Sequence, residues 1–223
     1  MSILPKISPN VYPLRVQSGN YFHLDMQDIG NKLIDHSEKS NHCIPYGAIP
    51  VAGRNGWARY FDGIDDYILD GYGRKILREG TLGKWESIEI GEVTKIVGTG
   101  TKLYLNDGNT LPPKFTGKLV SDFAQYCTAL RYFYCYDNQF SGYTAESFKT
   151  QKHLYICYMN NNAISNAADI NQILADLRYS KDNITDRVNC VVKLEDGTNA
   201  APTGQGITDK DYLNNNGWTV TTN

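Results

Sequence analysis

Hydrophobic and polar positions follow different patterns in successive stretches of the chain. Residues 1–45 combine prolines with polar runs, and apolar residues share a helical face only around Met26–His36, which predicts one short helix. Residues 46–118 contain short runs of β type separated by glycine turns, which predict a compact β-rich domain. The predicted runs in this domain are Ala58–Ile68, Trp85–Ile90, Thr94–Val97 and Lys102–Leu105.

The last stretch, residues 119–223, contains an internal repeat. Residues 130–140 (LRYFYCYDNQF) and 154–164 (LYICYMNNNAI) both fit the pattern LxxLxLxxNxL, with residues such as Phe and Cys in place of leucine, and their offset is 154 − 130 = 24 residues. This period lies within the range of leucine-rich repeats. The two matches predict coils of a solenoid, in which alternate residues of a short strand point inward. The predicted repeat core consists of Leu130, Phe133, Cys135, Asn138, Leu154, Cys157, Met159 and Asn162.

Helical periodicity returns after the second repeat unit. Apolar residues at i, i+3, i+4 and i+7 within Asn166–Tyr179 predict an amphipathic helix. Gly206–Leu213 is expected to form a short helix with Thr208 or Asp209 as its N-cap. The strands expected in this region are Val188–Leu194 and Gly217–Thr222.

These patterns predict an α+β fold in three parts. Residues 1–45 form an N-terminal arm or anchor, residues 46–118 a small mainly-β domain, and residues 119–223 a short leucine-rich-repeat-like solenoid. The solenoid is expected to contain parallel strands and one or two helices. Its last helix and strand are expected to cover the exposed end of its core.

Tyrosine is the most informative residue type, with 16 Tyr against 7 Phe. Tyr134 and Tyr158 lie between the inward positions of the two repeat units, so they are expected to point outward and to stack across strands about 4.8 Å apart. Such an aromatic platform suits a sugar ring or a protein partner. The alternatives are that this face packs on the chain's own β domain, on a neighbouring subunit or on another virion protein, or that tyrosine is simply favoured in strands. The candidate binding residues are Tyr134, Tyr158, Tyr132, Tyr136, Tyr155, Arg131 and Asn160.

Charge and composition narrow the class of protein. The 22 Lys+Arg and 24 Asp+Glu give a formal net charge of -2 without a basic stripe, so nucleic acid is not an expected partner. No apolar run reaches the roughly 18 residues of a membrane span, and no secretory signal is evident. We therefore expect a protein made in a reducing cytoplasm, without membrane insertion or a cofactor. Free, buried thiols are expected at Cys43, Cys127, Cys135, Cys157 and Cys190.

No motif in the sequence predicts an enzyme, and no catalytic residue is assigned. Carboxylate pairs such as Glu86 with Glu89, or Asp62 with Asp65, leave a glycan-degrading role open, because sequence spacing does not give their separation in space. Asp62, Asp65 and Asp66 could also gather oxygen ligands around Ca²⁺. The DxDxDG loop is missing, however, so solvated turn carboxylates without a metal are the preferred interpretation.

Two stretches resemble known families. Residues from about 125 to 223 resemble the terminal leucine-rich-repeat segment common in proteins of Bacteroidetes bacteria and their phages. The motifs that carry this resemblance are NQFSG (138–142), NQILADL (171–177), GTNAAPTGQGITDK (197–210) and NNGWTVTTN (215–223). Residues 60–68 (YFDGIDDYI) are similar to the FDGxDDYI strand that opens many laminin-G-like or concanavalin-like sandwiches. Too few residues follow before the repeats for a full sandwich, so we interpret this stretch as a fragment or a similar turn.

The resemblances imply recognition rather than chemistry, because such repeats bind proteins or glycans and laminin-G-like strands occur in carbohydrate- or surface-binding modules. They imply a phage virion protein, such as a head fibre, spike or tail component. Its arm would contact other virion proteins, and its tyrosines would contact a host glycan or protein. A homo-oligomer, with a trimer favoured, is expected. Two alternatives stay open: a purely structural capsid or tail decoration protein, and a bacterial surface adhesin or glycan-active protein.

Overall fold

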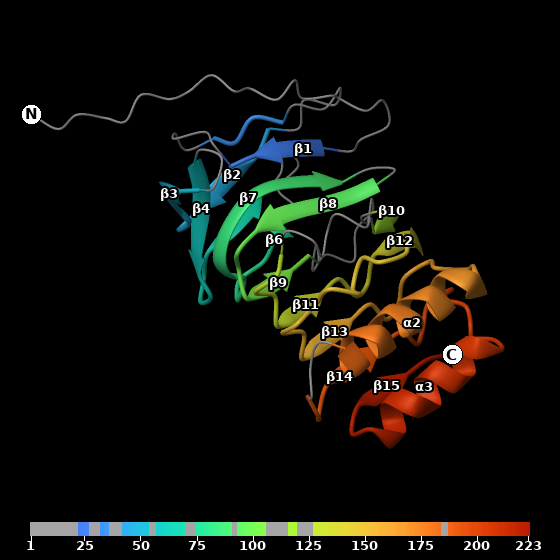
Figure 1. The fold of residues 1–223 in the computed structure, drawn as a ribbon. Helices are drawn as coiled ribbons and strands as arrows, with labels where there is room; N and C mark the ends of the chain where they lie inside the picture. Colours follow the sequence, from blue (N-terminus) through green and yellow to red (C-terminus); the bar gives the residue numbers. More distant parts are fainter. Residues whose placement is uncertain are drawn as a thin grey trace, which may run out of the picture.

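The structure is a computed structural model that describes residues 22–26, 32–35, 42–53, 57–69, 75–90, 93–105, 116–119, 127–183 and 187–223. Within these residues the chain has a mixed α+β fold, in which strands predominate and two helices occur near the C-terminal end. Figure 1 shows the last strands following one another as a stack, with both helices along one side of it.

The first part of the described chain consists of short strands, most of them antiparallel. They are β1 (Phe22–Asp25), β2 (Ile44–Tyr46), β3 (Ile49–Ala52), β4 (Trp57–Asp62), β5 (Tyr67–Leu69), β6 (Lys75–Leu77), β7 (Leu82–Ile90) and β8 (Val93–Gly98). The long strand β7 pairs with β1, β4 and β8, while β2, β5 and β6 form a separate sheet. The strands predicted at 85–90 and 94–97 are confirmed. The run predicted at 58–68 is two strands, β4 and β5, joined by a turn.

The helix predicted around Met26–His36 is wrong for the residues of that range that the structure describes. Leu33 and Cys43 form an antiparallel bridge, with N···O distances of 2.7 and 2.9 Å in the two directions. Both side chains and that of Met26 are fully buried. Pairing with a residue ten positions away (43 − 33) therefore determines the backbone conformation here. The helical spacing of the apolar residues does not determine it. Residues 1–21 of the predicted arm lie outside the described residues.

Five parallel strands, which we call the strand stack, form the second part of the fold. In the order in which they pair, they are β9 (Lys102–Tyr104), β11 (Tyr132–Tyr134), β13 (Ile156–Tyr158), β14 (Val191–Lys193) and β15 (Thr219–Thr221). Beside it, β10 (Thr116–Leu119) and β12 (Gln139–Tyr143) pair in parallel, and β10 also pairs with β8. An antiparallel pairing of Leu82 with Lys102 joins β7 to β9, so the strand stack continues the sheet of the first part.

The two helices are α2 (Ala167–Asn183) and α3 (Gln205–Asn215). The apolar face predicted for the first helix is buried, and α2 packs on β12 and α3. The N-cap predicted for the second helix is wrong, because α3 begins after Gly204, and Thr208 and Asp209 lie inside it. The Asp209 carboxylate is not available as a cap, since it accepts hydrogen bonds from Arg178 at 2.7 Å and Gln205 at 2.9 Å.

Two glycines and the core explain how the first part joins the strand stack. A Cβ atom on Gly98 or Gly100 would lie 2.6 or 2.3 Å from the ring of the fully buried Trp85. The connection from β8 to β9 therefore needs glycine to pass over the indole. With the exception of Ala58, the buried apolar side chains from Met26 to Val220 form one cluster, which includes all five cysteines. These cysteines form no disulfide with one another.

Candidate binding surface

Side chains of the strand stack alternate between an inward and an outward face. The inward residues at the strand centres are buried: they are Leu103, Phe133, Cys157, Val192 and Val220. Because strand side chains alternate with a period of two, their neighbours on both sides face outward. These neighbours form two rows across the strands, Lys102–Tyr132–Ile156–Val191–Thr219 and Tyr104–Tyr134–Tyr158–Lys193–Thr221.

Three tyrosines occupy successive positions of the second row, and we call the surface that carries them the tyrosine face. The rings of Tyr104 and Tyr134 are stacked, with centroids 4.2 Å apart and planes 5° from parallel. Tyr134 and Tyr158 meet edge to face, at 5.3 Å and 88°. The stacking expected between Tyr134 and Tyr158 is therefore wrong in its geometry. The Tyr104 ring covers one face of the Tyr134 ring, and the Tyr158 ring lies perpendicular to the Tyr134 ring.

Lysines lie at both ends of this tyrosine row. The Lys102 Nζ atom is 5.0 Å from the ring centroid of Tyr104, and the Lys193 Nζ atom is 4.7 Å from that of Tyr158. Both distances are typical of cation–π contacts. Burial and the neighbouring Tyr104 raise the pKa of Tyr134, so its hydroxyl group keeps its proton at neutral pH. The tyrosine row therefore lies between two lysine side chains.

The other candidate binding residues lie around this row. Tyr132 is half-buried in the first outward row, and the Tyr136 ring meets Tyr134 at 6.5 Å, edge to face. Arg131 and Tyr155 are exposed just before β11 and β13, and Asn160 is half-buried after β13. The strand stack thus brings Tyr132, Tyr134, Tyr136 and Tyr158 onto one surface. Arg131 and Tyr155 lie at the edge where the strands begin.

The repeat-core residues lie on the inward side of the same strands. The apolar members of the predicted core and both of its asparagines are buried. Asn162 donates to the carbonyl oxygens of Cys135 and Met159, each at 2.9 Å, and accepts from the Phe140 N–H at 3.1 Å. Asn138 donates in the same way to Leu105 and Cys135. Burial raises the pKa of the Cys135 and Cys157 thiols, which keeps them protonated core groups.

Two further asparagines continue this series, and sequence reasoning missed both of them. Asn199 donates to the carbonyls of Met159 and Leu194 and accepts from the Ile164 N–H at 3.0 Å. Asn223 donates to the Asn199 carbonyl and accepts from the Asp196 N–H. Each amide thereby links one turn of the strand stack to the next. The spacing from Asn162 to Asn199 is 37 residues because α2 is inserted between them, so a fixed period of 24 does not find it.

Tyr104 was also missed, although a short signal for it exists. Residues 103–105 (LYL) repeat the alternation of residues 133–135 (FYC) and 157–159 (CYM), with an outward tyrosine between two inward residues. The offset from Tyr104 to Tyr134 is 30 residues, which differs from the offset of 24 between the two matched units. A search for the three-residue alternation without a fixed period would have found it.

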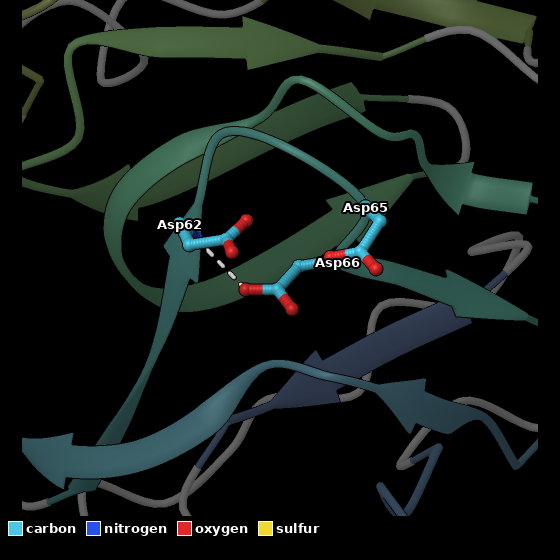
Figure 2. Close-up of side chains that lie close together, drawn as sticks. All are labelled: Asp62, Asp65 and Asp66. Atoms are coloured by element: carbon cyan, nitrogen blue, oxygen red, sulfur yellow. Dashed lines mark hydrogen bonds between the residues drawn. The ribbon is translucent and has the colours of Figure 1, made fainter.

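The acidic turn, Asp62–Asp66, lies between β4 and β5, and Figure 2 shows its three carboxylates turned toward one another. One oxygen of each lies within 4.8 Å of the others. The Asp66 carboxylate accepts a hydrogen bond from the Asp62 N–H at 2.8 Å, and that of Asp62 accepts from the Ile64 N–H at 2.7 Å. Burial raises the pKa of Asp66, and the charges of Asp62 and Asp65 raise it further. The carboxylates of Asp62 and Asp66 therefore stabilise the turn through hydrogen bonds, and a cation could also bind all three carboxylates.

Of the two carboxylate pairs considered for glycan hydrolysis, Asp62 and Asp65 lie together in the acidic turn. Glu86 is buried in β7, and the Glu89 side chain lies outside the described residues. Among the described histidines, His42 accepts a hydrogen bond from the Asp35 N–H, and His153 contacts Arg187.

No family model, no curated protein and no solved structure matches the chain. The resemblance of residues 125–223 to the terminal repeat segment of Bacteroidetes and phage proteins therefore stays a prediction. Neither helix in the described part of the chain has the length and apolar composition that a membrane span requires.

Proposed function

We propose that the strand stack is a short leucine-rich-repeat-like solenoid whose tyrosine face binds a host glycan or protein. In this proposal the protein is an attachment component of a bacteriophage virion, such as a head fibre, spike or tail protein, and residues 1–45 anchor it to other virion proteins. The virion assignment follows from the sequence resemblance, whereas the binding role follows from the tyrosine face.

The solenoid assignment is supported by the in-register parallel strands and by the asparagine series. In repeat proteins of this kind each coil is stabilised mainly by contacts with its neighbours. Asn138, Asn162, Asn199 and Asn223 make such contacts, since each donates to a backbone carbonyl of the preceding strand or turn. The asparagine of the LxxLxLxxNxL pattern thus links neighbouring turns by hydrogen bonds, as expected of a solenoid repeat.

The observation that carries the binding role is the row of Tyr104, Tyr134 and Tyr158 on consecutive strands. Tyrosine rings are large, rigid and amphipathic, so they cover a sugar ring or a protein side chain at a small entropic cost. A paired sheet holds them in fixed positions, which reduces the ordering cost of binding. The hydroxyl groups supply directional hydrogen bonds at the edge of the platform.

Substitution of the platform tests the binding role. We expect Tyr134→Ala with Tyr158→Ala to weaken binding of host cell-surface extract by about tenfold or more, as removal of central aromatic residues commonly does. The matched control is Tyr60→Ala with Tyr179→Ala, which removes two exposed tyrosines from β4 and α2. Biolayer interferometry measures binding, and circular dichroism measures the fold. Equal binding by the two double variants would contradict the role.

The virion assignment has its own test, which is location. An antibody to the protein should label a capsid vertex or a tail tip in electron micrographs of purified phage particles. Label on no particle would contradict the assignment and favour a bacterial adhesin. If the double variant keeps its binding but loses its assembly state in light scattering, the tyrosine face is a subunit contact.

A further inference from the structure

Basic side chains gather at the edge where β11, β13 and β14 begin. They are Arg131, Lys152 and Arg187, which we call the cationic patch, and His153 lies among them. Parallel strands start at the same edge of a sheet, so residues just before successive strands become neighbours. Two backbone hydrogen bonds hold this edge together, from the Tyr155 N–H to Arg131 at 2.7 Å and from the Val191 N–H to Tyr155 at 2.8 Å.

Side-chain contacts place Arg187 beside Tyr155 and His153, and a backbone hydrogen bond from Tyr155 places Arg131 at the same edge. The Arg187 guanidinium lies 4.7 Å from the ring centroid of the exposed Tyr155. One of its nitrogen atoms is 2.7 Å from the Nδ1 atom of His153. Because arginine only donates, Nδ1 must accept, so His153 is neutral and carries its proton on Nε2. Burial lowers the pKa of His153, and the charges of Arg187, Arg131 and Lys152 lower it further.

Arg131 and Lys152 supply two of the positive charges of the patch. No described acidic side chain forms an ion pair with Arg131 or Lys152. Both side chains are exposed. Lys102 and Lys193 add two positive charges at the ends of the tyrosine row. The chain as a whole has a formal net charge of -2, so this concentration of positive charge is local.

We propose that the tyrosine face and the cationic patch together bind an acidic glycan, with sugar rings against the tyrosines and carboxylate or sulfate groups at the patch. This inference rests on the proposed function and names the class of ligand. A glycan uses both features, because its rings pack on aromatic faces and its anionic groups accept charge-assisted hydrogen bonds from arginine and lysine. A local patch on a net acidic chain differs from the extended basic stripe that tracks a nucleic-acid backbone.

The test compares polysaccharides that differ in charge. Dextran sulfate and dextran share a backbone, and polygalacturonate supplies carboxylates in place of sulfates. We expect dextran sulfate, polygalacturonate or both to bind at least tenfold more tightly than dextran in calorimetry at 50 mM salt. Higher salt should weaken this preference, because exposed charges are screened.

Charge-removing variants locate the contact. Arg131→Gln with Lys152→Gln should weaken binding of the anionic polymer by about tenfold, the usual effect of losing two exposed charge contacts. The matched control is Lys149→Gln with Lys210→Gln, which removes two charges beside α2 and on α3. Thermal unfolding followed by circular dichroism establishes that both variants fold. Equal binding by the two variants would overturn the proposal, and so would tighter binding of single-stranded DNA of equal charge.

The same titrations separate this inference from the proposed function. If dextran binds as tightly as dextran sulfate, and Tyr134→Ala with Tyr158→Ala abolishes both, the binding role stands and the acidic-glycan inference fails. If the tyrosine variant binds normally while Arg131→Gln with Lys152→Gln does not, the proposed role of the tyrosine face fails.

Discussion

At the scale of single residues, Asn162 is the side chain that most directly couples neighbouring turns of the strand stack. We predict that Asn162→Ala lowers the free energy of unfolding by about 2–4 kcal/mol. The substitution removes two hydrogen bonds to the carbonyls of Cys135 and Met159 and leaves the Phe140 N–H buried without its acceptor. Urea unfolding followed by circular dichroism measures the change.

Asn160→Ala is the control for this prediction, because it removes the same type of side chain from a half-buried position two residues earlier. Its effect should stay within about 0.5 kcal/mol, as is usual for positions outside the core. If both variants lose the same stability, the amide of Asn162 contributes no more than a half-buried asparagine. The asparagine series would then not hold the strand stack together.

At the scale of elements, β15 ends the strand stack, and a side chain covers its open edge. Thr219 and Thr221 make their backbone hydrogen bonds to β14, so the N–H and C=O groups of Val220 point away from it. The Asn214 side chain of α3 bonds both, accepting from the Val220 N–H at 2.7 Å and donating to its carbonyl at 3.4 Å. It thereby takes the place of a further strand, which protects the edge from pairing with another chain.

We predict that Asn214→Ala destabilises the protein by about 1–2 kcal/mol and promotes self-association through β15. Asn215→Ala, at the next and exposed position of α3, should change neither property. Urea unfolding measures the first effect, and light scattering over a range of concentrations measures the second. If the Asn214→Ala variant is monomeric and as stable as Asn215→Ala, the Asn214 side chain is not needed to protect the edge of β15.

Elements that repeat, or that have their own periodicity, could be predicted from the sequence, and those decided by distant partners could not. The LxxLxLxxNxL units became β11 and β13, and the spacing of Ile170, Ile173 and Leu174 became the buried face of α2. The bridge of Leu33 with Cys43 replaced a predicted helix, because pairing outweighs local propensity. Strand register placed Tyr158 beside Tyr134, whereas the edge-to-face geometry of this pair is set by side-chain packing, and Tyr104, which stacks on Tyr134, lacks the period of 24.

At the scale of the whole molecule, the sheet and the core run from the first part into the strand stack. β9 pairs with β7 at one edge and with β11 at the other, and buried apolar residues on both sides belong to one cluster. Because the hydrophobic core is continuous, neither part has a core of its own. We therefore expect the two parts to unfold together.

Tryptophan fluorescence and circular dichroism can test this expectation, because they report on different parts. In a Trp218→Phe variant the remaining tryptophans, Trp57 and Trp85, lie in β4 and β7, whereas both described helices lie beside the strand stack. Thermal transitions measured by fluorescence and by ellipticity at 222 nm should coincide. Since Asn162 bonds the backbone just after β11 and β13 of the strand stack, adding Asn162→Ala should lower both midpoints equally. If only the midpoint measured by ellipticity shifts, the strand stack unfolds by itself. The pairing of β9 with β7 would then couple the two parts only weakly.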